Sequence, residues 1–361
     1  MLSDIADKKR RLLLLAYYYP PSEAIGAVRA QRLAKHLRQI GWEVVVASQD
    51  RRANRAASIE RDLVLVSGLL DTIAGFFPGK LKYQAKRVSD WLNRRYWLFW
   101  CRKAYARVRS LGDKFDIILA TGSPFISFEL ARKLSRDTGV PFVIDYRDPW
   151  IGWGQSAEKE REIMADAAAS LTVSPSLVEY LQDFAPDKGK VHLLTNGFDN
   201  ALGNGGLAVG AANSPDLRDT ILYPGRLYTP RIVLTPLLEA IKEFNSRTGF
   251  RIRLHYCGPS SEHALSEVRA TGTEDLCDVQ GSLPRSTTLS MQARAMINCV
   301  ICGVDIRAEG FRRGILTGKL FDCLSVERPI LIIAPENSDV EKMFAGRPGV
   351  ECVPAKMDRI V

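Results

Sequence analysis

Short apolar runs that alternate with helical patterns are the feature that most limits how this chain can fold. Each run is about four to eight residues long, which suits a strand buried on both faces of a parallel sheet. The expected strands cover residues 11–18, 42–48, 115–120, 141–145, 171–174, 190–194, 220–223, 250–257, 298–303 and 330–334. The expected helices cover residues 27–40, 125–138, 158–169, 175–184, 233–248 and 286–294. This order predicts an α/β fold with helices on both faces of the sheet.

The alternation stops once, in a segment crowded with Gly and Asn at residues 199–219, and then begins again. Such a segment is typical of a linker, and a chain of 361 residues is long enough for two domains. We expect a Rossmann-like domain at residues 1–200, a linker at 201–219 and a second Rossmann-like domain at 220–361. Two doubly wound domains that face each other would hold a ligand in the cleft between them, at the carboxyl ends of their strands.

The composition is that of a globular protein, with 46% hydrophobic and 25% charged residues. No apolar run approaches the roughly 20 residues that a membrane-spanning helix needs. The basic start at residues 8–11 resembles a signal peptide, but its apolar part is short and runs into Pro20 and Pro21. We therefore expect a buried first strand and a cytoplasmic chain. Cys299 and Cys302 lie in an apolar run without a second pair, so we expect structural roles for them.

The stretch from Gly314 to Cys323 carries the clearest sign of a ligand. A turn of small residues leads into a short helix with Thr317, Lys319 and Asp322, and a buried strand follows. This order places a cation, a hydroxyl and a carboxylate around a helix N-terminus, where exposed backbone N–H groups favour a phosphate. The stretch therefore predicts a site for a nucleotide sugar.

Motifs at residues 17–26, 33–37, 41–45, 145–150, 172–176, 196–199, 225–227 and 317–322 form a set whose order and spacing are specific. With this set the chain resembles the family 4 glycosyltransferases of the GT-B fold, over about residues 11–335. The resemblance implies a retaining transfer of a sugar from a nucleotide diphosphate donor, without a metal.

The resemblance also implies how the donor is held. The family places an Arg and a Lys five residues apart on the donor diphosphate, and Arg226 and Arg231 stand at these positions. A guanidinium binds phosphate through two hydrogen bonds and keeps its charge, so we expect the exchange at Arg231 to be tolerated. The expected donor-binding residues are Gly26, Gly225, Arg226, Arg231, Gly281, Thr317, Lys319, Leu320 and Asp322.

The family's pair of glutamates, eight positions apart, is altered in this chain. Asp322 takes the second position and is expected to accept hydrogen bonds from ribose hydroxyls, while Gly314 takes the first and has no side chain. Thr317 and Lys319 are expected to replace the missing glutamate, as in relatives that bind lipid-linked acceptors. The alternatives are a surface acid at Asp322 and an ordinary first-turn lysine at Lys319.

In the N-terminal domain the resemblance implies an acceptor side at the ends of strands. Gly26 would let its loop approach the donor sugar closely. Arg29, one helical step further, would reach a phosphate or the acceptor, and Ser123 would line the acceptor side from another strand end.

The segment after the strand at 141–145 completes the expected acceptor side with Asp145, Arg147 and Asp148. Arg147 and Asp148 stand where the family commonly has a His-Asp pair. Asp148 is expected to orient the acceptor hydroxyl or the sugar, and its alternative role is to cap the turn that follows it. Together with Arg226 and Lys319, Asp148 forms the expected catalytic set.

No group of His, Asp and Glu has the spacing of metal ligands, and the four histidines fall in different elements. We therefore expect neither a metal nor a cofactor. The resemblance implies a UDP-sugar or GDP-sugar as the donor substrate. The charge of the departing diphosphate would be neutralised by Arg226, Arg231, Lys319 and backbone N–H groups.

Residues 80–110 hold ten Lys and Arg against one acid, an excess equal to the net charge of +9 of the whole chain. They also hold three of the six tryptophans, at positions 91, 97 and 100. Aromatic and basic side chains along an apolar stripe suit the headgroup layer of an anionic bilayer. We expect a peripheral membrane patch that brings the enzyme to a lipid-linked acceptor. The alternative is an insertion packed on the N-terminal domain; nucleic-acid binding is not expected, because no recognised module surrounds the segment.

The leading hypothesis is a glycosyltransferase of the hexosyl or N-acetylhexosaminyl type that acts on a saccharide or lipid-linked saccharide in cell-surface polysaccharide synthesis. A UDP-N-acetylglucosamine 2-epimerase shares the fold, but it would be expected to carry acid/base carboxylates and histidines at several strand ends. A non-catalytic GT-B scaffold is the third hypothesis, because Gly314 replaces a glutamate. GT-B chains usually end with helices that cross back to the first domain, and this sequence stops at Val361, so we expect a truncated C-terminal domain.

Overall fold

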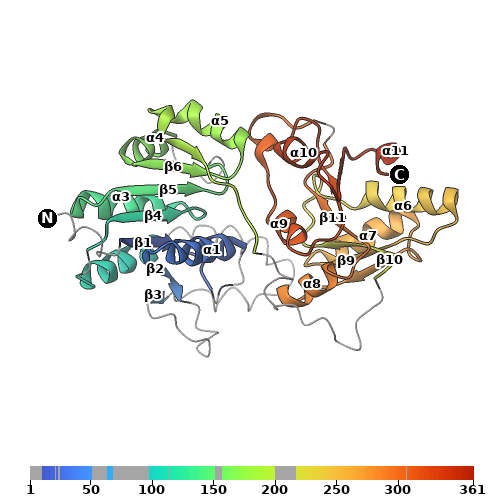
Figure 1. Ribbon diagram of the computed structural model, residues 1–361, viewed down its shortest axis with the longest axis horizontal. Helices are drawn as coiled ribbons and strands as arrows, with labels where there is room; N and C mark the ends of the chain where they lie inside the picture. The colour runs from blue at the N-terminus through green and yellow to red at the C-terminus, as the bar shows by residue number, and fades with distance from the viewer. Residues whose placement is uncertain are drawn as a thin grey trace, which may run out of the picture. The chain divides into compact units, whose positions relative to one another are not determined.

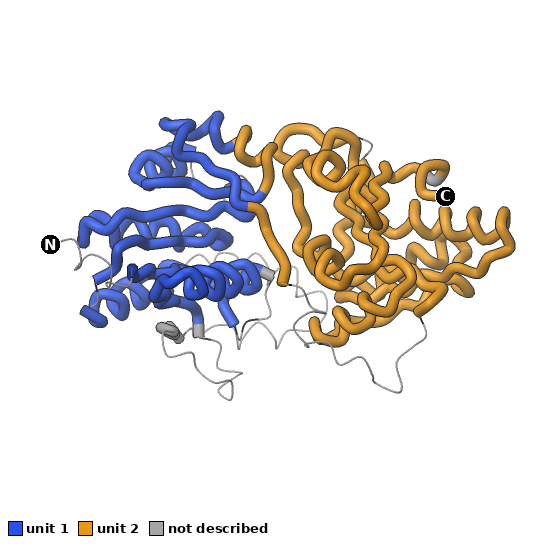
Figure 2. The backbone as a smooth tube through the Cα atoms, viewed as in Figure 1, with its two compact units in different colours: residues 1–173, 181–194 blue, residues 174–180, 195–361 orange. Residues whose placement is uncertain are grey.

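The computed structural model describes residues 10–20, 22, 25–50, 63–67, 97–112, 114–150, 157–199, 217–305 and 307–361. The chain divides into two compact units (Figure 2). Unit 1 holds residues 1–173 and 181–194, and unit 2 holds residues 174–180 and 195–361. Most of the expected linker, residues 201–216, lies outside the described residues.

Unit 1 is built on a parallel sheet of seven strands in the order β3-β2-β1-β4-β5-β6-β7 (Figure 1). The strands are β1 (Arg11–Ala16), β2 (Glu43–Asp50), β3 (Leu63–Ser67), β4 (Ile117–Thr121), β5 (Phe142–Tyr146), β6 (Ala169–Thr172) and β7 (Val191–Leu193). The helices are α1 (Ile25–Gln39), α3 (Ile126–Thr138), α4 (Ala157–Asp166), the 3-10 turn η3 (Lys188–Lys190) and a helix over residues 97–110. Helix α5 (Pro175–Phe184) is divided between the units, with residues 175–180 in unit 2 and residues 181–184 in unit 1. The strand order reverses between β1 and β4, so the sheet is doubly wound.

Unit 2 repeats the plan with six parallel strands in the order β10-β9-β8-β11-β12-β13. The strands are β8 (Thr220–Pro224), β9 (Arg253–Cys257), β10 (Cys277–Gln280), β11 (Ile297–Ile301), β12 (Ile330–Ile333) and β13 (Val350–Val353). The helices are α6 (Thr235–Thr248), α7 (Ser261–Thr271), α8 (Arg285–Gln292), η4 (Gly310–Gly314), α9 (Gly318–Leu324), α10 (Asp339–Phe344) and α11 (Met357–Ile360). In this sheet the strand order reverses between β8 and β11, so the switch point lies beside β8.

The central strands are apolar throughout because each face of the sheet meets a helix layer. All five residues of β8 are buried. Tyr223 packs with Leu237 of α6, whereas Leu222 packs with Met291 of α8. Successive side chains of a strand point to opposite faces, so α6 and α8 cover the two sides of this sheet (Figure 1). The predicted fold of two doubly wound α/β domains is confirmed, and every expected strand and helix is present, most of them with shifted ends.

In the described residues, no helix has both the length and the apolar character needed to cross a membrane.

A buried carboxylate attaches the first turn of α5 to the rest of unit 2. Asp339, the first residue of α10, is 2% exposed and accepts hydrogen bonds from the N–H and the Oγ of Ser176, both at 2.7 Å. Ser176 is also buried, at 3% exposure. The carboxylate therefore satisfies two donors that water does not reach, near the positive end of a helix dipole.

Replacing Asp339 with Ala should lower the free energy of unfolding by about 1–3 kcal/mol, because two buried donors of Ser176 lose their acceptor. Asp339→Asn keeps one acceptor oxygen and should cost less. Urea unfolding of the two variants beside the wild type measures the difference. An Ala variant as stable as the wild type would show that this contact does not hold α5 in place.

Candidate functional site

The turn after β8 brings a glycine and a lysine from a distant helix into contact. Gly225 has φ at +127°, a conformation that side chains rarely adopt, and its N–H donates to the carbonyl of Cys257 at 2.7 Å. A Cβ on Gly225 would collide with Cε of Lys319. The glycine is therefore needed twice, for its backbone angle and for the space that the lysine occupies.

The ammonium of Lys319 lies at the carboxyl end of β8 among neutral groups. It donates to the hydroxyl of Tyr223 at 3.0 Å and to the carbonyl of Arg226 at 3.1 Å, and it lies 4.7 Å from the centre of the Tyr223 ring. No carboxylate in the described part of the chain forms an ion pair with it. Burial lowers the pKa of Lys319 from 10.5 to about 8, and the nearby Arg226 charge acts in the same direction. The site thus holds a cation without a matching anion.

The loops after β8 and β9 support this lysine. A Cβ on Gly258 would collide with the carbonyl oxygen of Gly225, so the two loops touch backbone to backbone. Ser260 donates its N–H to the hydroxyl of Tyr256 at 3.0 Å, and its Oγ accepts from the N–H of Leu227 at 3.2 Å. Our sequence reasoning missed these supports, although Gly258 and Pro259 directly follow an expected strand.

The two arginines of the expected diphosphate site lie in different surroundings. Arg226 is exposed beside Lys319, and its carbonyl oxygen holds the lysine. Arg231 is half-buried in the turn between Tyr228 and Ile232, and it lines a hollow of only about 20 Å³ with Cys302 and other residues at the ends of β11 and β12. The structure therefore joins Arg226 and Lys319 directly, and a donor contact for Arg231 stays a prediction.

The remaining donor-side residues differ in their access to a ligand. Asp322 lies one turn after Lys319 in α9 and accepts a hydrogen bond from Arg285 at 2.5 Å. Gly281 is exposed in the loop before α8. Leu320, by contrast, is fully buried in the core of unit 2, so its side chain is not a ligand contact. The hydroxyl of Thr317 is buried and has no hydrogen-bond partner among the described residues.

The position of the family's first glutamate is closed by other parts of unit 2. A Cβ on Gly314 would collide with Oγ of Ser174 and lie 2.8 Å from Cγ of Leu177. The start of α5 thus occupies the space that a side chain at this position would need. A side chain at position 314 would therefore require Ser174 and Leu177 to move.

Arg29 and Asp145 form a buried ion pair in unit 1, which corrects the expectation that they face a ligand. Nη2 and Nε of Arg29 donate to the two carboxylate oxygens of Asp145 at 2.6 and 2.9 Å, and Nη2 also donates to the carbonyl of Leu194 at 2.9 Å. Arg29 is 8% exposed and Asp145 is fully buried. The pair joins α1, the end of β5 and the segment after β7, so both charges serve the unit itself.

Arg147 occupies the space above Gly26 that we expected the donor sugar to approach. It donates to the carbonyls of Gly122 and Ser123, the latter at 2.6 Å. A Cβ on Gly26 would collide with Nη1 of Arg147. The glycine therefore makes room for this guanidinium, which ties together the loops after β1, β4 and β5. Asp148 is exposed, and no described residue forms a hydrogen bond with it.

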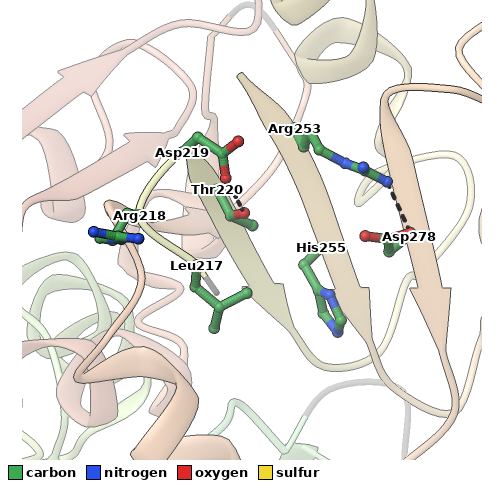
Figure 3. A pocket seen from close by; sticks show the side chains of 7 residues that line it. All are labelled: Leu217, Arg218, Asp219, Thr220, Arg253, His255 and Asp278. Carbon is green, nitrogen blue, oxygen red and sulfur yellow. Dashed lines mark hydrogen bonds and ion pairs between the residues drawn. The ribbon is translucent and has the colours of Figure 1, made fainter. Parts of the chain in front are cut away.

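A hollow of about 470 Å³ lies at the opposite, amino ends of β8, β9 and β10 (Figure 3). Its lining includes Arg253, which pairs with Asp278 at 3.0 Å, and His255. Ligands of open α/β sheets bind at the carboxyl ends of the strands, so this hollow is not the candidate site.

Residues 26–197 match the family of glycosyl transferase 4-like domains. The N-terminal part of the chain is thus similar in sequence to this family. A comparison with curated proteins found no match in sequence.

Solved structures of similar fold cover both units. Sucrose-phosphate synthase from Thermosynechococcus elongatus is 12% identical with a TM-score of 0.61, covering 98% of this chain and 88% of that one. HepE of Anabaena, solved with UDP and glucose, is 12% identical with a TM-score of 0.62, covering 97% of this chain and 88% of that one. A UDP-N-acetylglucosamine 2-epimerase is 12% identical with a TM-score of 0.52, covering 98% of this chain and 85% of that one. The expected resemblance to family 4-like proteins of the GT-B fold is confirmed.

Among the described residues, no three His, Cys, Asp or Glu side chains gather as a metal site requires. Independence of a metal stays a prediction for this glycosyltransferase-like chain.

The lowered pKa of Lys319 makes anion binding at this site depend on pH. Below pH 8 the group is a cation, whereas above it the empty site holds a neutral amine that must take up a proton when a diphosphate binds. The affinity for UDP or GDP should therefore fall between about pH 7 and about pH 9.5. Calorimetry in buffers of different ionisation enthalpy would detect the proton.

Lys319→Arg keeps its charge over this range and should flatten the profile. A wild-type affinity that is the same at both ends of the range would refute the role of Lys319.

Proposed function

We propose that this chain is a retaining glycosyltransferase that uses a UDP-sugar or GDP-sugar donor. The proposal rests on the ammonium of Lys319, which neutral groups hold beside Arg226 at the carboxyl end of β8 and which forms no ion pair with a carboxylate among the described residues. A buried cation without a counter-ion is costly, and a diphosphate would supply the missing charge. The family of residues 26–197 and the GT-B fold support this proposal.

Catalysis would consist mainly of electrostatic stabilisation. As the bond between the sugar and the diphosphate breaks, Lys319 and Arg226 would neutralise the charge that develops on the leaving oxygens. The acceptor oxygen would form the new bond on the same face of the sugar, and its proton would pass to the leaving phosphate. Asp148, exposed after β5, would orient the acceptor hydroxyl.

The acceptor would be a saccharide or a lipid-linked saccharide in cell-surface polysaccharide synthesis, with a hexose or N-acetylhexosamine as the transferred sugar. We propose that the enzyme acts at the cytoplasmic face of an anionic membrane. Residues 80–96 of the basic segment lie outside the described residues, and residues 97–110 are helical. This helix supports the proposal because its exposed side is basic and contains no acid, with Arg102, Lys103, Arg107 and Arg109.

Two exposed apolar side chains lie in the first turn of the same helix. Leu98 is 50% and Phe99 is 43% exposed, and the ammonium of Lys103 lies 4.6 Å from the centre of the Phe99 ring. The side chain of Trp100 is instead buried, with 2% exposure. Its ring meets the ring of Tyr17 edge to face, with 5.3 Å between the ring centres. Trp100 therefore belongs to the core of unit 1, which corrects its place in the expected membrane patch.

Donor binding should require Arg226. Replacing it with Gln removes a charged donor to the diphosphate and should weaken the binding of UDP-sugar or GDP-sugar by about tenfold or more. Arg251→Gln is the matched control, because Arg251 is an exposed arginine before β9, at the other end of the sheet. Thermal-shift titration against both kinds of nucleotide sugar identifies the donor, and calorimetry gives the affinities.

Transfer predicts that nucleotide is released only when an acceptor saccharide is present. Interconversion of the donor sugar without an acceptor would point to an epimerase. No binding of any nucleotide sugar would point to a non-catalytic scaffold.

Binding to vesicles that contain phosphatidylglycerol should depend on the helix at 97–110. Reversing the charges of Arg102 and Lys103 to Glu should reduce co-sedimentation at least about tenfold, because each basic residue near an anionic surface contributes about 1 kcal/mol. Leu98→Ser with Phe99→Ser should also reduce it, and Arg251→Glu should not. Equal binding of all variants, or equal binding to phosphatidylcholine vesicles, would refute a membrane role for this face.

A further inference from the structure

We propose that Arg285 is a positioning residue that holds Asp322 for the ribose of a ribonucleoside diphosphate. This inference rests on the proposed function. The observation that carries it is the contact between Nη2 of Arg285, the first residue of α8, and Oδ1 of Asp322 in α9, at 2.5 Å.

Helix α9 carries two functional groups that point to different loops. Lys319 and Asp322 are three residues apart, so they share one face of the helix with roughly 5–6 Å between their Cβ atoms. Lys319 reaches the loop after β8, and Asp322 reaches the start of α8, directly after the loop that follows β10. A diphosphate on Lys319 and Arg226 would thus place the adjoining ribose beside Asp322, and the base toward the loop that contains Gly281.

The ion pair between Arg285 and Asp322 contributes little to the stability of the fold. The side chain of Arg285 is 49% exposed and that of Asp322 is 27% exposed, and such surface pairs contribute about 0–1 kcal/mol. Arg285 also places a cation in the first turn of a helix, where the helix dipole opposes it. What the pair does is restrict the Asp322 side chain to one orientation.

The carboxylate keeps the capacity to bind a ligand while Arg285 holds it. An ionised carboxylate has about four acceptor sites, so a hydrogen bond from Arg285 leaves it able to accept from ribose hydroxyls. The two helices are also joined further along, where Nε2 of Gln292 donates to Sγ of Cys323 at 3.1 Å. The backbone beneath Asp322 is therefore held independently of Arg285, and removing Arg285 should remove its restraint on the carboxylate without moving α9.

A second Arg–Asp pair in the same unit provides a matched control. Arg253 and Asp278 form a partly exposed pair at 3.0 Å in the hollow at the amino ends of β9 and β10 (Figure 3). Arg253→Gln removes a comparable pair from the same sheet, at the end opposite to Lys319.

The test compares ribonucleoside diphosphates with their 2′-deoxy forms by calorimetry, using UDP, GDP, CDP and ADP, with inorganic pyrophosphate as the ligand without ribose. The affinity of the wild type for its preferred ribonucleotide should be at least about tenfold higher than its affinity for the deoxy form. This ratio corresponds to the loss of one hydrogen bond to a charged group. Arg285→Gln should reduce this ratio toward one and leave pyrophosphate affinity unchanged. Arg285→Lys should keep part of the ratio, and Arg253→Gln should keep all of it.

Equal affinity of the wild type for ribo and deoxy forms would overturn this inference and leave the proposed function intact. So would an Arg285→Gln variant that loses affinity for ribo, deoxy and pyrophosphate ligands alike, since that pattern indicates a general structural role. A wild type that binds neither nucleotides nor pyrophosphate would refute the proposed function itself.

Discussion

Both sheets of this protein are buried on both faces, and this constraint decides where chemistry can occur. The buried strand β8 and the strands beside it have apolar side chains on either side, in contact with helices. Polar groups can therefore reach a ligand only at the strand ends and in the loops that follow. Unit 2 has Arg226 and Lys319 at such an end, where the strand order reverses. The position of Lys319 follows from this packing, because α9 lies over the sheet and extends its lysine across Gly225.

The same constraint explains which elements could be predicted from the sequence. Strands with two buried faces appear as continuous apolar runs, and all of those in the central part of each sheet were expected. The missed strands, β3, β10 and β13, each lie at the edge of a sheet. In β10 and β13 only one residue of four is buried, so their sequences lack an apolar run. Edge strands depend on pairing with a neighbour that is distant in sequence, which a local pattern does not reveal.

Residue types at the candidate site were predictable, but their partners were not. The Gly225-Arg226 turn and the Lys319 helix both stood out, and the structure brings them together. Gly26 also stood out, but for the wrong reason: the space beside it belongs to Arg147, which lies far away in sequence. The predicted acceptor-side roles of Arg29 and Asp145 were wrong for a similar reason, since the charge of each is balanced by the other. A sequence shows which side chains carry charge, whereas only the fold shows which charges neutralise one another.

This difference in pairing separates Arg29 from Lys319. Arg29 donates to both oxygens of the Asp145 carboxylate, which neutralises its charge. Lys319 has a hydroxyl, a carbonyl and an aromatic face, which orient an ammonium without neutralising it. Burial lowers the pKa of Lys319, because it removes solvation that no carboxylate in the described part of the chain replaces. A dianionic ligand at the end of β8 would recover this energy on binding, so the cost of keeping the lysine half-buried would become a source of affinity.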